Sequence, residues 1–203
     1  MLVYLIRHGE TYNNAEAVFP LDNTELNEKG VLQARDAGKY IRDINFDAVY
    51  TSPILRVIET LNHMGIHEYT KDDRLMDIGT GKLTGRKIVE IASLDPNWYT
   101  TFQDGVENRY RVEKFSELKK RVKNFIDSIS QMDYNSVLVA THLEPIRGMF
   151  SLATEINGLP LTKLEIGNCS ISVFSMNNGN IELKGFNWLP LQNYNGNKNK
   201  SFY

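Results

Sequence analysis

Two histidines and two arginines stand just after short apolar segments, and their chemistry fits a phosphate group. Arg7 and His8 directly follow the first such segment. Arg56 follows a second segment within a few residues, and His142 directly follows a third. An arginine guanidinium binds two phosphate oxygens at once, and a neutral imidazole is a competent nucleophile near pH 7. If the three segments end at one edge of a sheet, the four side chains form an anion site, and phosphate is the anion that suits them best.

The apolar segments have the length and the β-branched content of buried strands. The predicted strands are Leu2–Ile6, Ala48–Thr51, Val137–Thr141, Ile171–Phe174 and Ile181–Leu183, with a weaker candidate at His67–Thr70. Apolar residues recur at helical spacing in Asn27–Ile41 and in Phe115–Met132. Strands that alternate with helices, followed by a run of strands, predict an α/β fold with a mostly parallel sheet and an antiparallel edge. Ligands of such sheets bind beyond the carboxyl ends of the strands, where the four side chains lie.

Prolines mark two expected helix starts near these side chains. Ser52-Pro53 has the pattern of an N-cap followed by proline at the first helical position, and Glu144-Pro145 repeats the proline. No linker or repeat interrupts the chain, so residues 1–191 are predicted to form one domain. The polar, asparagine-rich residues 192–203 are predicted to form a mobile tail.

Composition narrows the class of protein. The 203 residues carry a net charge of −2, and no basic run is present, so nucleic acid is not an expected partner. The single cysteine, Cys169, excludes a disulfide framework, and the N-terminal apolar segment is too short to span a bilayer. We therefore expect a cytoplasmic protein that binds neither nucleic acid nor a membrane.

Each of these residues also has a structural alternative. A histidine after a strand can be a packed core residue, Arg56 can be a solvated surface charge, and Arg7 can pair only with Glu10. A metal-dependent hydrolase is a further alternative, because His63 and His67 are four residues apart. A glycine between these two histidines is expected to end their helix, and an arginine beside His8 would repel a divalent cation.

The segment LIRHGETYNN resembles the signature of the histidine phosphatase superfamily, which includes the cofactor-dependent phosphoglycerate mutases. Five further segments resemble motifs of that family, in the same order and over nearly the whole chain: TELNEKGVLQA, VYTSPILRVIET, RLMDIGTGKLTG, VLVATHLEPIRGMF and IGNCSISVF. The resemblance implies the three-layer α/β/α sandwich of the phosphoglycerate mutase type, with residues 1–191 as its catalytic domain.

The roles of individual residues are likewise implied by the resemblance. His8 matches the nucleophile that takes the phosphoryl group, and His142 matches a second histidine that faces the phosphate. The residues that match phosphate-binding positions are Arg7, Asn14, Arg56 and His142. Phosphoryl transfer depends mainly on positioning and on positive charge, which arginines and a protonated histidine would provide without a metal ion or another cofactor.

The chain departs from the family pattern at two positions of the expected site. Asp77 occupies the position of the proton donor, where most members have glutamate, and Glu113 in VEKFSELKKRV is the reserve candidate for that role. Leu143 replaces the glycine that usually follows the second histidine, which is expected to tighten the floor of the pocket.

A phosphatase is the favoured function, acting on a small phosphorylated metabolite. The family's mutases are longer, with an insertion that carries paired arginines, and no such insertion is visible between Leu83 and Phe115. Thr80 stands where mutases have tyrosine. A cofactor-dependent phosphoglycerate mutase is the first alternative, and an inactive phosphoester-binding protein is the second. The substrate and the oligomeric state, for which a homodimer is one option, stay open.

Overall fold

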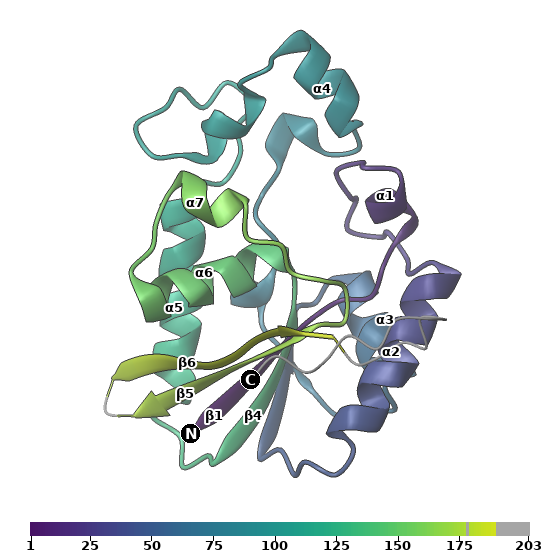
Figure 1. The fold of residues 1–203 in the computed structure, drawn as a ribbon, viewed down its shortest axis with the longest axis vertical. Coiled ribbons are helices and arrows are strands. Elements are labelled where there is room, and N and C mark those ends of the chain that lie inside the picture. The colour runs from purple at the N-terminus through teal and green to yellow at the C-terminus, as the bar shows by residue number, and fades with distance from the viewer. Residues whose placement is uncertain (178, 190–203) are drawn as a thin grey trace, which may run out of the picture.

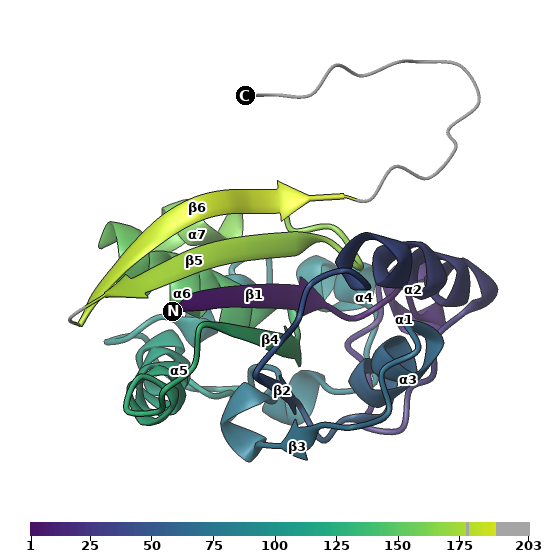
Figure 2. The same ribbon diagram turned by 90° about the horizontal axis from the view of Figure 1, so that it is seen from below.

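The computed structural model describes residues 1–177 and 179–189. Within these residues one six-stranded sheet has the order β3-β2-β4-β1-β5-β6, and Figure 2 shows the strands in this sequence from one edge to the other. The strands are β1 (Leu2–Arg7), β2 (Ala48–Thr51), β3 (Thr70–Lys71), β4 (Ser136–Thr141), β5 (Ile171–Asn177) and β6 (Asn180–Trp188). The first four pair in parallel, whereas β5 and β6 pair antiparallel at one edge, as predicted.

Helices cover both faces of the sheet, which makes the three layers expected from the sequence (Figure 1). The helices are α1 (Tyr12–Ala15), α2 (Glu28–Ile41), α3 (Leu55–His63), α4 (Ile88–Leu94), α5 (Phe115–Ile129), α6 (Leu143–Thr154) and α7 (Leu159–Thr162). One core lies between the sheet and α5 with α6, and the second lies between the sheet and α2 with α3. The predicted α/β/α sandwich is confirmed.

The central strands β1 and β4 are apolar on both faces because each face meets a helical layer. Val3 and Leu5 of β1 lie in the core of α5 and α6, whereas Ile6 lies in the core of α2 and α3. In β4, Val139 and Leu138 divide between the two cores in the same way. This double burial explains why the strands that precede the candidate site are continuous apolar runs in the sequence.

The two helix starts that prolines predict are not observed at those positions, whereas α2 begins with a side-chain cap. Asn27 caps α2, and its side chain accepts a hydrogen bond from the Gly30 amide at 2.8 Å. The predicted helix start at Ser52-Pro53 is wrong, because α3 begins at Leu55 with no side-chain cap. In α6 the proline is likewise the third helical residue and not the first, and His142 is the N-cap.

Two strand predictions also need correction. The weak candidate at residues 67–70 is displaced, because β3 comprises only Thr70–Lys71 and lies exposed at the edge of the sheet. Strand β6 is much longer than the predicted Ile181–Leu183. The predicted tail 192–203 and the predicted domain end at residue 191 lie outside the described residues.

A separate small cap lies beyond the carboxyl ends of the parallel strands (Figure 1). It contains α4 and the short 3-10 helices Gly81–Leu83 and Trp98–Phe102, and it has its own apolar cluster around Leu83 and Ile91. No helix of the described part of the chain has the length and apolar character needed to cross a membrane.

Candidate active site

The ends of β1, β4 and β2 meet at one edge of the sheet and bring distant residues together. Arg7 is opposite Thr141 in the register of β1 and β4, and the His8 amide donates to the Thr141 carbonyl at 3.0 Å. On the other side of β4, the Ser52 amide donates to the Ala140 carbonyl at 3.0 Å. The residue that follows Thr141 is His142, so both histidines leave the sheet beside each other, as the sequence predicts.

The imidazole of His8 is buried in a defined orientation, with 3% of the residue exposed. Its Nδ1 lies 2.7 Å from the Gly9 carbonyl oxygen. Because a carbonyl oxygen only accepts hydrogen bonds, Nδ1 carries the proton and the neutral ring keeps its lone pair on Nε2. Burial, followed by the charges of Arg56 and Arg7, lowers the pKa of His8 well below its ordinary value. His8 is therefore neutral at pH 7, which is the state that a nucleophile requires.

His142 is fully buried and faces His8, with the two ring centroids 5.2 Å apart. Its Nε2 shares a hydrogen bond with the Ser52 hydroxyl at 2.9 Å. Its Nδ1 has no hydrogen-bond partner among the described residues and lies 3.8 Å from the Asp77 carboxylate. Burial and the nearby charge of Arg56 hold the pKa of His142 well below its ordinary value. In the absence of a bound anion His142 is therefore neutral near pH 7, and its protonation beside a phosphoryl group stays a prediction.

Arg56 is buried, Arg7 is half-buried, and each has an unused donor that is itself buried. The Nε atoms of Arg7 and Arg56 have no hydrogen-bond partner among the described residues. Their other donors are anchored, since Arg7 Nη1 donates to the Ile166 carbonyl and Arg56 Nη1 donates to the Leu21 carbonyl at 3.2 Å. Burial lowers the pKa of both guanidinium groups. Arg56 is not a solvated surface charge, because only 3% of it is exposed.

The unused polar atoms of this site fit an oxyanion. Buried donors almost always have partners in folded proteins, so an unpaired buried donor needs an explanation. Here the Nε atoms of Arg7 and Arg56 and the Nδ1 atom of His142 are buried without a partner in the described chain. A tetrahedral anion with several acceptor oxygens can satisfy such donors together, and arginine forks suit phosphate in particular.

Two of the structural alternatives are not supported by the packing. The ion pair of Glu10 is with Lys29 at 2.6 Å and not with Arg7. For the metal alternative, His63 is the last residue of α3 and His67 lies in the following loop. Among the residues that the structure describes, no group of three or more potential metal-ligand side chains lies together.

Asn14 lines the same cavity as Arg7 and His8. Its backbone amide and side-chain oxygen form a reciprocal capping box with Thr11 at the start of α1. Asn168 donates to the His8 carbonyl at 3.0 Å and approaches the Asn14 oxygen at 3.4 Å. The structure thus joins Asn14 to the histidine loop through Asn168.

The two candidate proton donors have different surroundings. Asp77 lines the cavity, and its Oδ2 lies 3.6 Å from Arg56 Nη2. The Glu113 carboxylate is instead held by Arg121, whose Nε donates to it at 2.7 Å, and by the Gly79 amide at 2.9 Å. Arg121 also donates to the Asp77 carbonyl at 2.9 Å. Glu113 therefore braces the loop that carries Asp77, and it does not line the cavity.

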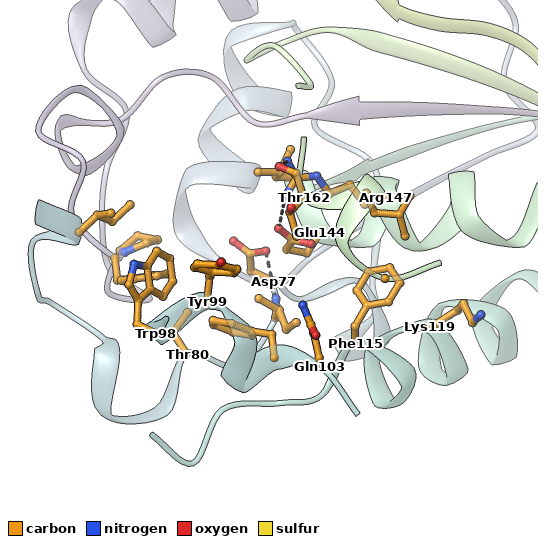
Figure 3. A pocket seen from close by; sticks show the side chains of 18 of the residues that line it. Asp77, Thr80, Trp98, Tyr99, Gln103, Phe115, Lys119, Glu144, Arg147 and Thr162 are labelled. Atoms are coloured by element: carbon orange, nitrogen blue, oxygen red, sulfur yellow. Dashed lines mark hydrogen bonds and ion pairs between the residues drawn. The ribbon is translucent and has the colours of Figure 1, made fainter. Parts of the chain in front are cut away.

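The cavity has a volume of about 780 Å³, which is large enough for a small metabolite. Its aromatic lining comes from Phe19, Trp98, Tyr99, Phe102 and Phe115. Figure 3 shows Asp77 and Glu144 between two ends of the cavity, with Trp98 and Tyr99 at one end and Phe115 and Lys119 at the other. The cavity thus has a polar middle and apolar walls.

Comparison with known proteins agrees with this geometry. The family model of the histidine phosphatase superfamily (branch 1) matches residues 3–189. The chain belongs to the histidine phosphatase superfamily.

Relatives within the superfamily carry more than one activity in their names. A 2,3-bisphosphoglycerate-dependent phosphoglycerate mutase of Thermoplasma acidophilum is 31% identical over 185 residues, which cover 89% of this chain and 90% of the relative. Phosphoserine phosphatase 1 of Hydrogenobacter thermophilus is 26% identical over 182 residues and covers 85% of both chains. A solved structure of phosphoserine phosphatase from Entamoeba histolytica in complex with phosphoserine has a TM-score of 0.78 and 25% identity, covering 92% of this chain and 96% of that one.

Several residues that shape this superfamily site were missed in the sequence. Ser52 was interpreted as a helix cap, although its hydroxyl binds His142. Arg121 has no predicted role and Glu144 is predicted only as part of a helix start, because a charged residue is ordinary in a helix. The segments VYTSPILRVIET and VLVATHLEPIRGMF contain Ser52 and Glu144, so the motifs marked the right regions without assigning these two side chains. Leu143 does line the cavity.

Proposed function

We propose that this member of the histidine phosphatase superfamily is a metal-independent phosphomonoesterase that acts on a small phosphorylated metabolite through a phosphohistidine intermediate. The observation that carries the proposal is the state of His8, a buried neutral imidazole that directs its Nε2 lone pair away from the Gly9 carbonyl. Unpaired Nε donors of Arg7 and Arg56 lie at the same edge of the sheet and suit the phosphoryl oxygens, and His142 Nδ1 is a further donor when the Ser52 hydroxyl donates to Nε2.

In the first step, His8 Nε2 attacks phosphorus and the bond between phosphorus and the ester oxygen breaks. The leaving oxygen takes a proton from Asp77 in its acid form, so an alcohol departs and Asp77 becomes a carboxylate. In the second step, water attacks the phosphohistidine, Asp77 takes one proton from the water, and the bond between His8 and phosphorus breaks. Inorganic phosphate leaves, and both residues return to their starting states.

Electrostatic stabilisation is the largest contribution that we assign to the site. Charge on the equatorial phosphoryl oxygens faces Arg7 and Arg56. One unit charge pair at about 4 Å contributes roughly 4 kcal/mol at an effective dielectric constant near 20. Only the part of this attraction that strengthens as charge develops in the transition state lowers the barrier, while the rest contributes to binding of the phosphate.

A cofactor-dependent phosphoglycerate mutase is the second candidate, and the relative from Thermoplasma acidophilum favours it. The deciding experiment supplies 3-phosphoglycerate with a trace of its 2,3-bisphosphate and measures both products. We expect release of inorganic phosphate without faster interconversion of the monophosphates. Rapid formation of 2-phosphoglycerate with little free phosphate would establish the mutase.

An inactive phosphoester-binding protein is the third candidate. A panel of phosphate esters, including p-nitrophenyl phosphate, tests it against the proposal. We expect phosphate release that falls to background in His8→Ala, because the fold offers no second imidazole with a free lone pair at the end of β1. Binding of esters without turnover by the unaltered protein would favour the third candidate.

A further inference from the structure

A second carboxylate besides Asp77 lines the cavity and has no part in the proposed reaction. Glu144 is the second residue of α6, two positions after His142, and 22% of its side chain is exposed. Arg147 Nη1 donates to its Oε1 at 2.6 Å. Arg147 thus fixes one oxygen of Glu144, and the carboxylate remains partly exposed in the wall of the cavity, where a ligand can reach it.

The charge of Arg147 is not available to a ligand in the same way. Its Nε and Nη2 donate to the Leu164 carbonyl at 3.0 and 2.7 Å, and Nη2 also donates to the Thr162 carbonyl at 2.9 Å. These bonds, with the one to Glu144, fasten the loop after α7 onto α6. Arg147 therefore holds both Glu144 and this loop in place by hydrogen bonds.

Glu144 and Asp77 line the same cavity and lie beside each other in its middle (Figure 3). Asp77 is the proposed donor to the leaving oxygen, so the first carbons of the departing alcohol lie near both carboxylates. The other cation that lines the cavity, Lys119, is bound to the Asn157 side chain at 2.5 Å and lies beyond Phe115 (Figure 3).

We propose that Glu144 is a specificity-determining residue that selects phosphate esters whose alcohol carries an ammonium group near the ester oxygen. The carboxylate accepts a charge-assisted hydrogen bond from the ammonium through Oε2, and it repels a carboxylate at the same position of the substrate. The inference rests on the proposed phosphatase function and names its substrate class, amino-alcohol phosphates. It predicts that phosphoglycerates are poorer substrates, since they carry a carboxylate and no ammonium.

Three two-carbon esters test the proposal because all are phosphate esters of a CH2 group and they differ at the second carbon. Phosphoethanolamine carries an ammonium, 2-hydroxyethyl phosphate carries a hydroxyl, and 2-phosphoglycolate carries a carboxylate. We expect kcat/KM to fall in that order, with phosphoethanolamine preferred over 2-phosphoglycolate by about tenfold or more, the scale of one charge-assisted hydrogen bond.

The variants isolate the charge of Glu144. Glu144→Gln keeps the size and an oxygen for Arg147, and we expect it to reduce the preference for phosphoethanolamine over 2-phosphoglycolate by about tenfold. Glu144→Asp keeps the charge and should keep the direction of the preference. Asp104→Asn is the matched control, because Asp104 also lines the cavity but is bound to the Ser116 hydroxyl at 2.5 Å. It should leave the ratio unchanged.

The unaltered protein provides a test that does not depend on any variant. Burial, followed by the charge of Asp77, raises the pKa of Glu144, while Arg147 and Arg7 oppose the rise. Since the ammonium needs the ionised carboxylate, the preference should weaken as the pH falls through this pKa.

Three results overturn the inference in distinguishable ways. A preference of the unaltered protein for 2-phosphoglycolate contradicts it directly, as does a ratio that Glu144→Gln leaves unchanged while p-nitrophenyl phosphate is still hydrolysed. If no ester is hydrolysed at all, including p-nitrophenyl phosphate, the proposed function itself is wrong and the inference falls with it.

Discussion

Replacing Asp77 by asparagine should lower kcat more for esters whose leaving oxygen is more basic. Asp77 lines the cavity, and its Oδ2 lies 3.6 Å from Arg56 and 3.8 Å from His142. Asparagine has nearly the same size but cannot donate an acidic proton. An alkyl alcohol leaves as a strongly basic alkoxide unless it is protonated, whereas p-nitrophenolate is stable without a proton.

The expected magnitudes follow from these roles. For alkyl phosphates, loss of a general acid should lower kcat by about 10²- to 10⁴-fold, or roughly 2.7 to 5.4 kcal/mol in the barrier. For p-nitrophenyl phosphate, we expect a loss of less than about tenfold. Asp77→Asn also removes a negative charge that faces the phosphate dianion, so KM for both esters should stay the same or fall.

The assay compares both substrates in Asp77→Asn and in the matched variant Glu113→Gln. Glu113 accepts hydrogen bonds from Arg121 and from the Gly79 amide, so its loss loosens the loop that carries Asp77. We expect Glu113→Gln to reduce stability by about 1 to 3 kcal/mol and to affect both substrates alike. If Glu113→Gln shows the leaving-group dependence and Asp77→Asn treats both esters alike, the donor has been assigned to the wrong residue.

Three further predictions concern the histidines and the absence of a metal requirement. Ser52→Ala removes the hydrogen bond to buried His142 and should lower both kcat/KM and the free energy of unfolding, the latter by about 1 to 3 kcal/mol. The control Ser170→Ala removes a buried hydroxyl without a partner and should cost much less. Equal losses for the two variants in thermal and kinetic assays would refute this. Folding lowers the pKa values of His8 and His142, so below the unfolded-state histidine pKa of about 6.5 the unfolded chain binds more protons than the folded one. The free energy of unfolding should therefore decrease as the pH falls from about 6.5 toward the folded pKa values. The expected slope is at most roughly 1.4 kcal/mol per histidine and pH unit. A pH series of unfolding midpoints should show this slope, with a smaller slope in His8→Asn, and a flat profile would contradict it. Activity should survive EDTA and be inhibited by orthovanadate, since arginines supply the positive charge; activity that is lost on chelation and restored by zinc or manganese would exclude the proposed mechanism.

The elements that could be predicted from the sequence are those whose burial produces a continuous apolar run of residues. Strands β1 and β4 are covered on both faces, so their residues form continuous apolar runs that end just before His8 and His142. Strand β6 lies at the edge of the sheet and is mostly exposed or half-buried, so only a short apolar piece of it stood out. The two-residue strand β3 is too short and exposed to leave any alternating pattern.

The parts of the site that could not be predicted depend on contacts between distant residues. Ser52 has the local pattern of a helix cap, but its hydroxyl is bound by a histidine 90 residues away. Glu113 could be distinguished from Asp77 only after Arg121, on the next helix, was seen to hold its carboxylate. The lowered pKa of His142 could not be predicted either, because the sequence does not reveal that this histidine is buried beside Arg56 and His8.

The most direct test of the central claim is to trap the phosphorylated enzyme. The protein is mixed with a phosphate ester labelled in its phosphoryl group, quenched in alkali, digested and mapped by mass spectrometry. We predict acid-labile, alkali-stable label on His8 and no label in His8→Ala, which should also lose turnover. Label on a serine, or hydrolysis by His8→Ala at the rate of the unaltered protein, would contradict the account.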